Sequence, residues 1–153
     1  MSKSKLKIKS VSGPRRQYAA LPVQLAGDGT PRVLLLTSRG TRRWVIPKGW
    51  PMNGMSPAAA AAREAYEEAG LEGTIEDAVP IGHYHYEKGL PGGRSVRLQV
   101  AVFLLIVSRQ LPTWPEQAER ETRWCDPEEA AELVAEPELA AILRALRPAR
   151  MAG

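Results

Sequence analysis

The stretch GWPMNGMSPAAAAAREAYEEAGL, residues 49–71, contains a helix whose two ends are both marked in the sequence. Ser56 is a good N-cap residue, and Pro57 fits the first helical position because a backbone N–H would have no partner there. Gly70 is typical of the residue that ends a helix in the left-handed conformation. We therefore predict a helix over residues 57–69, preceded by a loop rich in glycine and proline.

Three glutamates fall on one side of this predicted helix. At about 100° per residue, Glu64, Glu67 and Glu68 share one stripe, and alanines form a second stripe that lets the helix lie close to a sheet. Like charges at this spacing repel each other. One interpretation is a solvated acidic surface with Arg63 paired to Glu67. The other is a site for a divalent cation, for which carboxylate oxygens favour Mg²⁺ or Mn²⁺.

Length and composition indicate one globular domain. The chain has 153 residues, of which 44% are hydrophobic. We expect a basic N-terminal tail over residues 1–16, one domain over residues 17–147 and a C-terminal tail over residues 148–153. No apolar run approaches the roughly 18 residues of a membrane span. The N-terminal segment lacks the features of a secretory signal, and the single cysteine, Cys125, agrees with a reducing compartment. These observations predict a cytoplasmic protein with no membrane partner.

β-permissive segments surround the helix. Strands are expected at residues 17–26, 32–38, 42–47, 74–88, 95–110 and 122–126, with a hairpin between the two longest and with helices starting at Pro127 and near Pro137. Because strands precede and follow the central helix, we expect an α/β fold in which helices cover a mixed sheet.

The spacing of the opening stretch closely resembles the Nudix box, G-x5-E-x7-R-E-U-x-E-E-x-G-U, in which U is a bulky apolar residue. The matching residues are Gly49, Arg63, Glu64, Glu67, Glu68, Gly70 and Leu71. Met55 stands where the pattern has its first glutamate, and Ala65 is smaller than the usual apolar residue. That glutamate supports the loop in the family, so the resemblance implies that Met55 affects loop order and affinity more than activity.

Two further segments, TSRGTRRWVIPKGWP (37–51) and RWCDPEEAAELV (123–134), resemble the diphosphoinositol-polyphosphate and diadenosine-polyphosphate branch of Nudix hydrolases. The resemblance implies a Nudix-type α/β/α sandwich with a central mixed β-sheet flanked by helices. It also implies a pyrophosphohydrolase that uses Mg²⁺ or Mn²⁺ to cleave a phosphoanhydride bond of a nucleoside or inositol polyphosphate. The expected partner is therefore a polyphosphorylated small molecule, and the protein is expected to be a monomer or homodimer.

The resemblance also implies roles for individual residues. Glu64, Glu67 and Glu68 would hold the metal together with the backbone carbonyl of Lys48, and Arg63 would fix the rotamer of one carboxylate.

A glutamate outside the box commonly adds a metal ligand or the general base in this family. The candidates here are Glu116, Glu119 and Glu121, of which we favour Glu121. Glu64 is the other candidate for the base.

Basic side chains near the box suit phosphate groups, which guanidinium and ammonium groups bind well. The candidates for substrate binding are Arg39, Arg42, Arg43, Lys48, Arg94 and Arg97.

Two alternatives remain open at the level of the sequence. The basic N-terminal tail would suit an enzyme that removes pyrophosphate from RNA 5′ ends, although RNA is not the favoured partner. Loss of the first glutamate at Met55 would suit a non-catalytic Nudix-like module that binds a ligand or nucleic acid. ADP-ribose hydrolysis is less favoured, because Tyr86, Glu87 and Lys88 stand where that branch has a proline.

Overall fold

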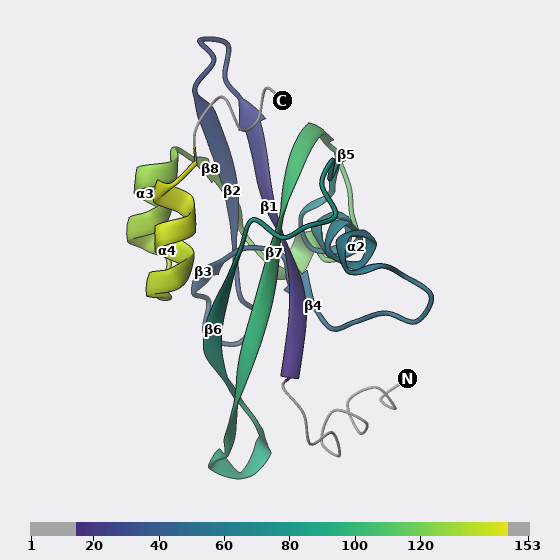
Figure 1. Ribbon diagram of the computed structural model, residues 1–153, viewed down its shortest axis with the longest axis vertical. Helices are drawn as coiled ribbons and strands as arrows, with labels where there is room; N and C mark the ends of the chain where they lie inside the picture. The colour runs from purple at the N-terminus through teal and green to yellow at the C-terminus, as the bar shows by residue number, and fades with distance from the viewer. Residues whose placement is uncertain (1–14, 147–153) are drawn as a thin grey trace.

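A computed structural model describes residues 15–146 of the chain (Figure 1). The two tails predicted at the ends lie outside the described residues, except that Arg15 and Arg16 belong to the first strand.

The strands in the described residues are β1 (Arg15–Leu25), β2 (Pro31–Thr37), β3 (Trp44–Val45), β4 (Lys48–Gly49), β5 (Leu71–Thr74), β6 (Gly82–Gly89), β7 (Ser95–Gln110) and β8 (Thr122–Cys125). The α-helices there are α2 (Pro57–Ala69), α3 (Pro127–Leu133) and α4 (Pro137–Arg144). Of these helices, none combines the length and apolarity needed to cross a membrane.

The strands form one mixed sheet. Its order is β3-β2-β1-β7-β5, with β4 paired to β1, β6 to β7 and β8 to β2. β1 and β7 are parallel, and the other pairs are antiparallel. Helix α2 covers one face of the sheet, while α3 and α4 cover the other (Figure 1). The expected α/β/α arrangement is therefore confirmed.

Helix α2 has the predicted limits. The Ser56 hydroxyl accepts a hydrogen bond from the Ala59 N–H at 3.1 Å, and Gly70 ends the helix with φ 68°. Ala61, Ala65 and other small side chains of α2 are fully buried against Phe103 and its neighbours in the sheet. Because these side chains are so small, α2 lies close to the sheet, and the backbone under the acidic stripe is held firmly.

The strand predicted over residues 74–88 is wrong as a single element, because β5 ends at Thr74 and β6 begins at Gly82. The chain turns between them, where the Val79 N–H donates to Asp77 Oδ1 at 3.0 Å and Pro80 has no N–H for a ladder. β5 and β6 then pair with different halves of the 16-residue strand β7.

A second difference lies just before α2. Residues 48–49, predicted as loop, form the short strand β4 beside β1, with Tyr18 opposite Gly49 and Ala19 opposite Lys48. This pairing brings the start of the Nudix-like motif into the sheet, next to α2. β3 is also shorter than the strand predicted over residues 42–47.

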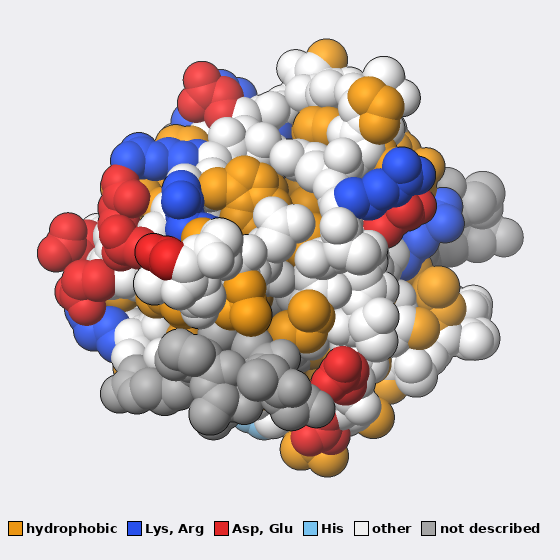
Figure 2. All heavy atoms as spheres, turned by 90° about the horizontal axis from the view of Figure 1, so that it is seen from above, with side chains coloured by type: hydrophobic (Ala, Val, Ile, Leu, Met, Phe, Trp, Pro, Cys, Tyr) orange, Lys and Arg blue, Asp and Glu red, His pale blue; other side chains and the backbone are white. Residues whose placement is uncertain are grey.

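Charged side chains are mixed on the surface. On the end of the molecule that carries the β1–β2 turn, acidic and basic groups lie beside each other at the rim (Figure 2).

Candidate functional site

A cleft of about 790 Å³ lies between α2, β4, the hairpin of β6 and β7, and the segment that follows β7. Its charged lining residues are Glu64, Glu68 and Glu116, together with Arg15, Arg39, Lys48, Lys88 and Arg120. Acidic groups come from α2 and from residue 116, and most of the cations come from strands and their connections. Acidic and basic side chains therefore line the same cleft.

Gly49 lies directly against the Glu64 carboxylate. A Cβ added at Gly49 would overlap Oε2 and Cδ of Glu64, so a side chain there would force the carboxylate to move. β4 places this glycine beside the helix, because Gly49 pairs with Tyr18 of β1. The contact explains why a residue without a side chain stands fifteen positions before Glu64.

Glu64, which is half-buried, and Glu68, which is buried, form an acidic pair on the cleft wall. Their carboxyl groups interact with each other across one turn of the helix. Burial, above all other causes, raises the pKa of Glu64, and it raises the pKa of Glu68 well above the usual range. Glu68 is only 6% exposed. Two neighbouring carboxyl groups offer the hard oxygen ligands that a divalent cation prefers.

Glu67 points elsewhere. Its Oε2 accepts a hydrogen bond from Arg63 Nε at 2.7 Å, and the guanidinium of Arg63 also lies 5.3 Å from the centre of the Tyr66 ring. The predicted pairing of Arg63 with a carboxylate is therefore present, but it holds Glu67 away from Glu64 and Glu68. Within residues 15–146, no three His, Cys, Asp or Glu side chains are placed to hold a metal ion as they stand.

The segment over residues 111–121 is attached to the C-terminal end of α2, where the helix leaves carbonyl groups without intrahelical partners. Trp114 Nε1 donates to the Glu68 carbonyl at 3.2 Å, and the Glu116 N–H donates to the Glu67 carbonyl at 3.0 Å. The Leu111 N–H donates to the Gly70 carbonyl at 2.8 Å. These bonds place an irregular segment against the acidic pair.

Of the three candidate glutamates outside the motif, Glu116 is the one among the residues that line the cleft. Glu119 pairs with Arg39 at 2.8 Å, and both side chains are largely exposed. Glu121, which the sequence analysis favoured, is exposed, and its backbone bonds to Thr37 at the start of β8. Glu116 therefore lies at the cleft, whereas Glu121 is not among the residues that line it.

Arg120 was missed by the sequence analysis. Its Nε lies 2.9 Å from Glu116 Oε1, and its Nη2 lies 3.8 Å from Glu68 Oε2. Its Nη1 donates to the Thr37 carbonyl at 3.1 Å. The four-residue spacing from Glu116 to Arg120 was visible in the sequence, but the contact with Glu68 joins residues 52 positions apart.

The predicted phosphate-binding residues divide into two groups. Arg39 and Lys48 line the cleft, and Lys48 Nζ lies 5.0 Å from the centre of the Tyr86 ring. Burial lowers the pKa of Lys48. Lys88 and Arg15, which the sequence analysis did not select, also line the cleft.

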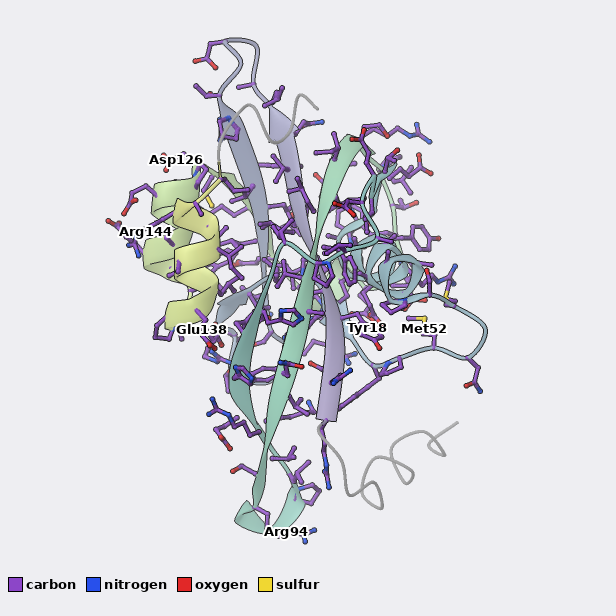
Figure 3. The ribbon with its side chains drawn as sticks, in the orientation of Figure 1. Tyr18, Met52, Arg94, Asp126, Glu138 and Arg144 are labelled. Carbon is purple, nitrogen blue, oxygen red and sulfur yellow. The ribbon has the colours of Figure 1, made fainter. Side chains whose placement is uncertain are left out.

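The other four basic candidates are not among the residues that line the cleft. Arg42 Nη1 donates to the Glu119 carbonyl at 3.4 Å, and Arg43 pairs with the buried Glu136 at 3.0 Å. Arg94 lies at the tip of the β6–β7 hairpin (Figure 3), and Arg97 lies on the same hairpin, facing Glu87.

Comparison with known proteins identifies related sequences. The model of the NUDIX domain family matches residues 15–146. Nudix hydrolase 16, mitochondrial, from Arabidopsis thaliana is 35% identical in an alignment of 112 residues that covers 69% of this chain and 59% of that protein. Diphosphoinositol polyphosphate phosphohydrolase 3-alpha from Mus musculus is 27% identical over 104 residues, which are 67% of this chain and 58% of that protein. The chain spans between 51% and 59% of the length of Arabidopsis Nudix hydrolases 12, 13 and 16.

Solved structures share the fold. The Ap4A hydrolase of C. elegans superposes with a TM-score of 0.58 at 20% identity, covering 86% of this chain and 95% of that one. A NUDIX hydrolase from Nitrosomonas europaea gives a TM-score of 0.63 at 22% identity, covering 86% and 87%. The names of several plant relatives place them in mitochondria, so the cytoplasmic location expected for this chain stays a prediction.

Proposed function

Because the chain belongs to the NUDIX domain family, we propose that it is a divalent-metal-dependent pyrophosphohydrolase of nucleoside or inositol polyphosphates. The observation that carries this proposal is the acidic pair of Glu64 and Glu68, which lines a cleft together with several cations. Diadenosine and diphosphoinositol polyphosphates are the favoured substrates. Two proteins that this chain resembles, the Ap4A hydrolase and the diphosphoinositol polyphosphate phosphohydrolase, are named for such substrates.

The donor atoms of the site suit Mg²⁺ or Mn²⁺. Carboxylate oxygens of Glu64, Glu68 and Glu116 are hard ligands, and the backbone at Lys48 and Gly49 lies beside them. Glu67 would join this set once its carboxylate leaves Arg63. When bound, the metal would neutralise phosphate charge and lower the pKa of a water molecule. We retain Glu64, Glu67, Glu68 and the Lys48 carbonyl as proposed ligands, and we propose Glu116 in the place first given to Glu121.

Glu64 is the proposed general base. Its carboxylate lies on the cleft wall, where it can approach the attacking water. The absence of a side chain at Gly49 leaves room for that carboxylate beside β4. Glu64 would accept the proton of the attacking water from this position.

The cations of the cleft are the proposed phosphate ligands. Arg39, Lys48 and Lys88 come from the β2–β3 connection, β4 and β6, and all three line the cleft that Glu64 and Glu68 also line. An ammonium or guanidinium group binds the non-bridging oxygens of a phosphate, and several such groups suit a chain of phosphates. This arrangement favours a substrate with more phosphates than a simple nucleoside diphosphate.

The test is a substrate panel. Diadenosine tetraphosphate, a diphosphoinositol polyphosphate and 5′-triphosphorylated RNA are each incubated with Mg²⁺, with Mn²⁺ or with EDTA. We expect product from at least one of the first two substrates with metal and none with EDTA. Glu68→Gln should abolish turnover, while Glu128→Gln, a matched change on the exposed surface of α3, should not.

Each negative result overturns a different part of the proposal. Product from RNA alone would show that the substrate is the 5′ end of RNA and not a small polyphosphate. Equal activity in EDTA would overturn the metal dependence.

A second candidate function is a ligand-binding module without catalysis. One observation favours it, because Arg63 and Arg120 occupy positions beside Glu67 and Glu68. Tight binding of diadenosine tetraphosphate in EDTA, without cleavage when metal is added, would support it.

A further inference from the structure

A side-chain cation lies beside the acidic pair of the cleft. The Arg120 side chain is 10% exposed and contacts Glu116, Glu68 and the Thr37 carbonyl. Among the described residues, Arg120 forms ion pairs with two carboxylates of the cleft, those of Glu68 and Glu116. Its position is therefore set by the same oxygen atoms that we propose as metal ligands.

Charge balance explains why a cation is needed there. Burying a carboxylate is costly unless it is paired or protonated, and the buried Glu68 lies on a cleft wall that Glu64 and Glu116 also line. Arg120 supplies positive charge to Glu68 and to Glu116, so it stabilises the wall when no metal ion is bound.

The three contacts of Arg120 differ in strength. Nε and Nη1 lie 2.9 Å from Glu116 Oε1 and 3.1 Å from the Thr37 carbonyl, which are ordinary hydrogen-bond distances. Nη2 lies 3.8 Å from Glu68 Oε2, which is an ion pair without a hydrogen bond. The Glu68 contact can therefore open while the Thr37 contact keeps the guanidinium in place.

We propose that Arg120 is a built-in counter-ion that competes with the divalent cation for the carboxylates of Glu68 and Glu116. In the metal-free protein, Arg120 holds these groups together and attaches the segment over residues 111–121 to β2. Metal binding replaces the Glu68 contact and weakens the Glu116 contact. Arg120 thus stabilises the metal-free state and lowers the affinity for the metal. This inference rests on the metal dependence of the proposed function.

The test measures metal binding without substrate. The purified chain and its Arg120→Gln variant are titrated with MnCl₂ by isothermal titration calorimetry, and their thermal unfolding is followed in EDTA. We expect Arg120→Gln to bind Mn²⁺ more tightly, by on the order of tenfold, because a buried charge pair is worth more than an exposed one. The metal-free variant should unfold at a lower temperature than the metal-free parent.

Two control variants test whether the change in Mn²⁺ affinity comes from losing the contacts of Arg120 or from losing any positive charge. Arg39→Gln removes a cation that lines the same cleft but pairs with Glu119, and Arg109→Gln removes a distant cation that pairs with Glu72 at 2.9 Å. Both should change the Mn²⁺ affinity by less than about threefold, since exposed charges are screened. If Arg39→Gln raised the affinity as much as Arg120→Gln, the competition by contact would be refuted.

The remaining outcomes separate this inference from the proposed function. Weaker or unchanged Mn²⁺ binding in Arg120→Gln, with binding intact in the parent, overturns the inference and leaves the metal dependence standing. Absence of Mn²⁺ binding in both proteins overturns the metal dependence as well. Should the variant fail to fold, the Arg120 side-chain N–H resonance of the parent is followed by NMR during titration with Mg²⁺. A resonance that moves as the metal binds supports competition, and one that stays fixed refutes it.

Discussion

Gly49 and Glu64 are in such close contact that no side chain fits between them. A Cβ at position 49 would overlap the Glu64 carboxylate, although the two residues belong to β4 and α2. The contact links the strand edge of the sheet to the acidic stripe of the helix. The position of the Glu64 carboxylate therefore depends on the absence of a side chain at Gly49.

Gly49→Ala should therefore displace the Glu64 carboxylate. Because a misplacement of about 1 Å can cost on the order of a hundredfold in rate, we expect kcat to fall by that order. The melting temperature should change little, since the end of a glutamate side chain can rotate away. Gly27→Ala is the control, because an added Cβ there meets nothing within 4 Å. Full activity of Gly49→Ala in the substrate assay would show that the contact is not required.

Gly70→Ala should destabilise the fold. Gly70 has φ 68°, a left-handed conformation that costs other residues about 1–2 kcal/mol. An added Cβ would also overlap the Trp114 ring, whose Nε1 bonds to the Glu68 carbonyl. We expect the free energy of unfolding to fall by at least about 2 kcal/mol in urea, followed by tryptophan fluorescence. Gly89→Ala, with an ordinary φ and nothing within 4 Å of the added Cβ, should cost far less.

The acidic pair should make the stability of the metal-free protein depend on pH. Burial raises the pKa of Glu64 and Glu68 above the ordinary value of 4.5, so the folded protein keeps protons that the unfolded chain releases. The resulting stability is fully present below about pH 4.5 and is lost as the pH rises through the folded pKa values.

Glu68→Gln should weaken this pH dependence, because an amide does not ionise. Melting temperatures in EDTA between about pH 4.5 and pH 8 should fall less steeply for the variant than for the parent. Other titrating groups, such as the exposed Glu138 with its lowered pKa, are common to both proteins and cancel in the difference. Parallel curves for the two proteins would contradict the role of burial.

Lys48→Gln should weaken substrate binding. The Lys48 ammonium lies in the cleft over Tyr86, and a charged contact to phosphate is lost with it, so KM should rise by about tenfold. Arg97→Gln removes a cation that is 67% exposed on the β6–β7 hairpin, and it should leave KM unchanged. An equal rise of KM in both variants would place the substrate along the hairpin instead of inside the cleft.

Local features of the chain were predicted well because their causes are local. Helix α2 has the predicted limits, since Ser56 and Gly70 act on residues within one turn of themselves. The strand over residues 95–110 has the predicted limits as well, because its apolar run is long and uninterrupted. The break between β5 and β6 was missed although Pro80 is a local signal for it, and only tertiary structure shows that the two strands pair with different parts of β7.

The site was predicted in part for the same reason. Periodicity places Glu64, Glu67 and Glu68 on one side of a helix, but it does not determine where each carboxylate points. Arg63 is four residues from Glu67 and holds it outside the cleft. Glu116 reaches the cleft because its N–H bonds to the Glu67 carbonyl, a contact between segments 49 positions apart.

The sequence by itself determined a helix with an acidic stripe, its alanine packing surface and the glycine that precedes it, because spacing and caps act over a few residues. Tertiary structure decided that Glu64 and Glu68 face the cleft, that Glu116 and Arg120 join them, and that Arg94 and Arg97 do not. These outcomes depend on side-chain rotamers and on contacts between segments brought together by the sheet. Such contacts leave no periodic pattern in the chain.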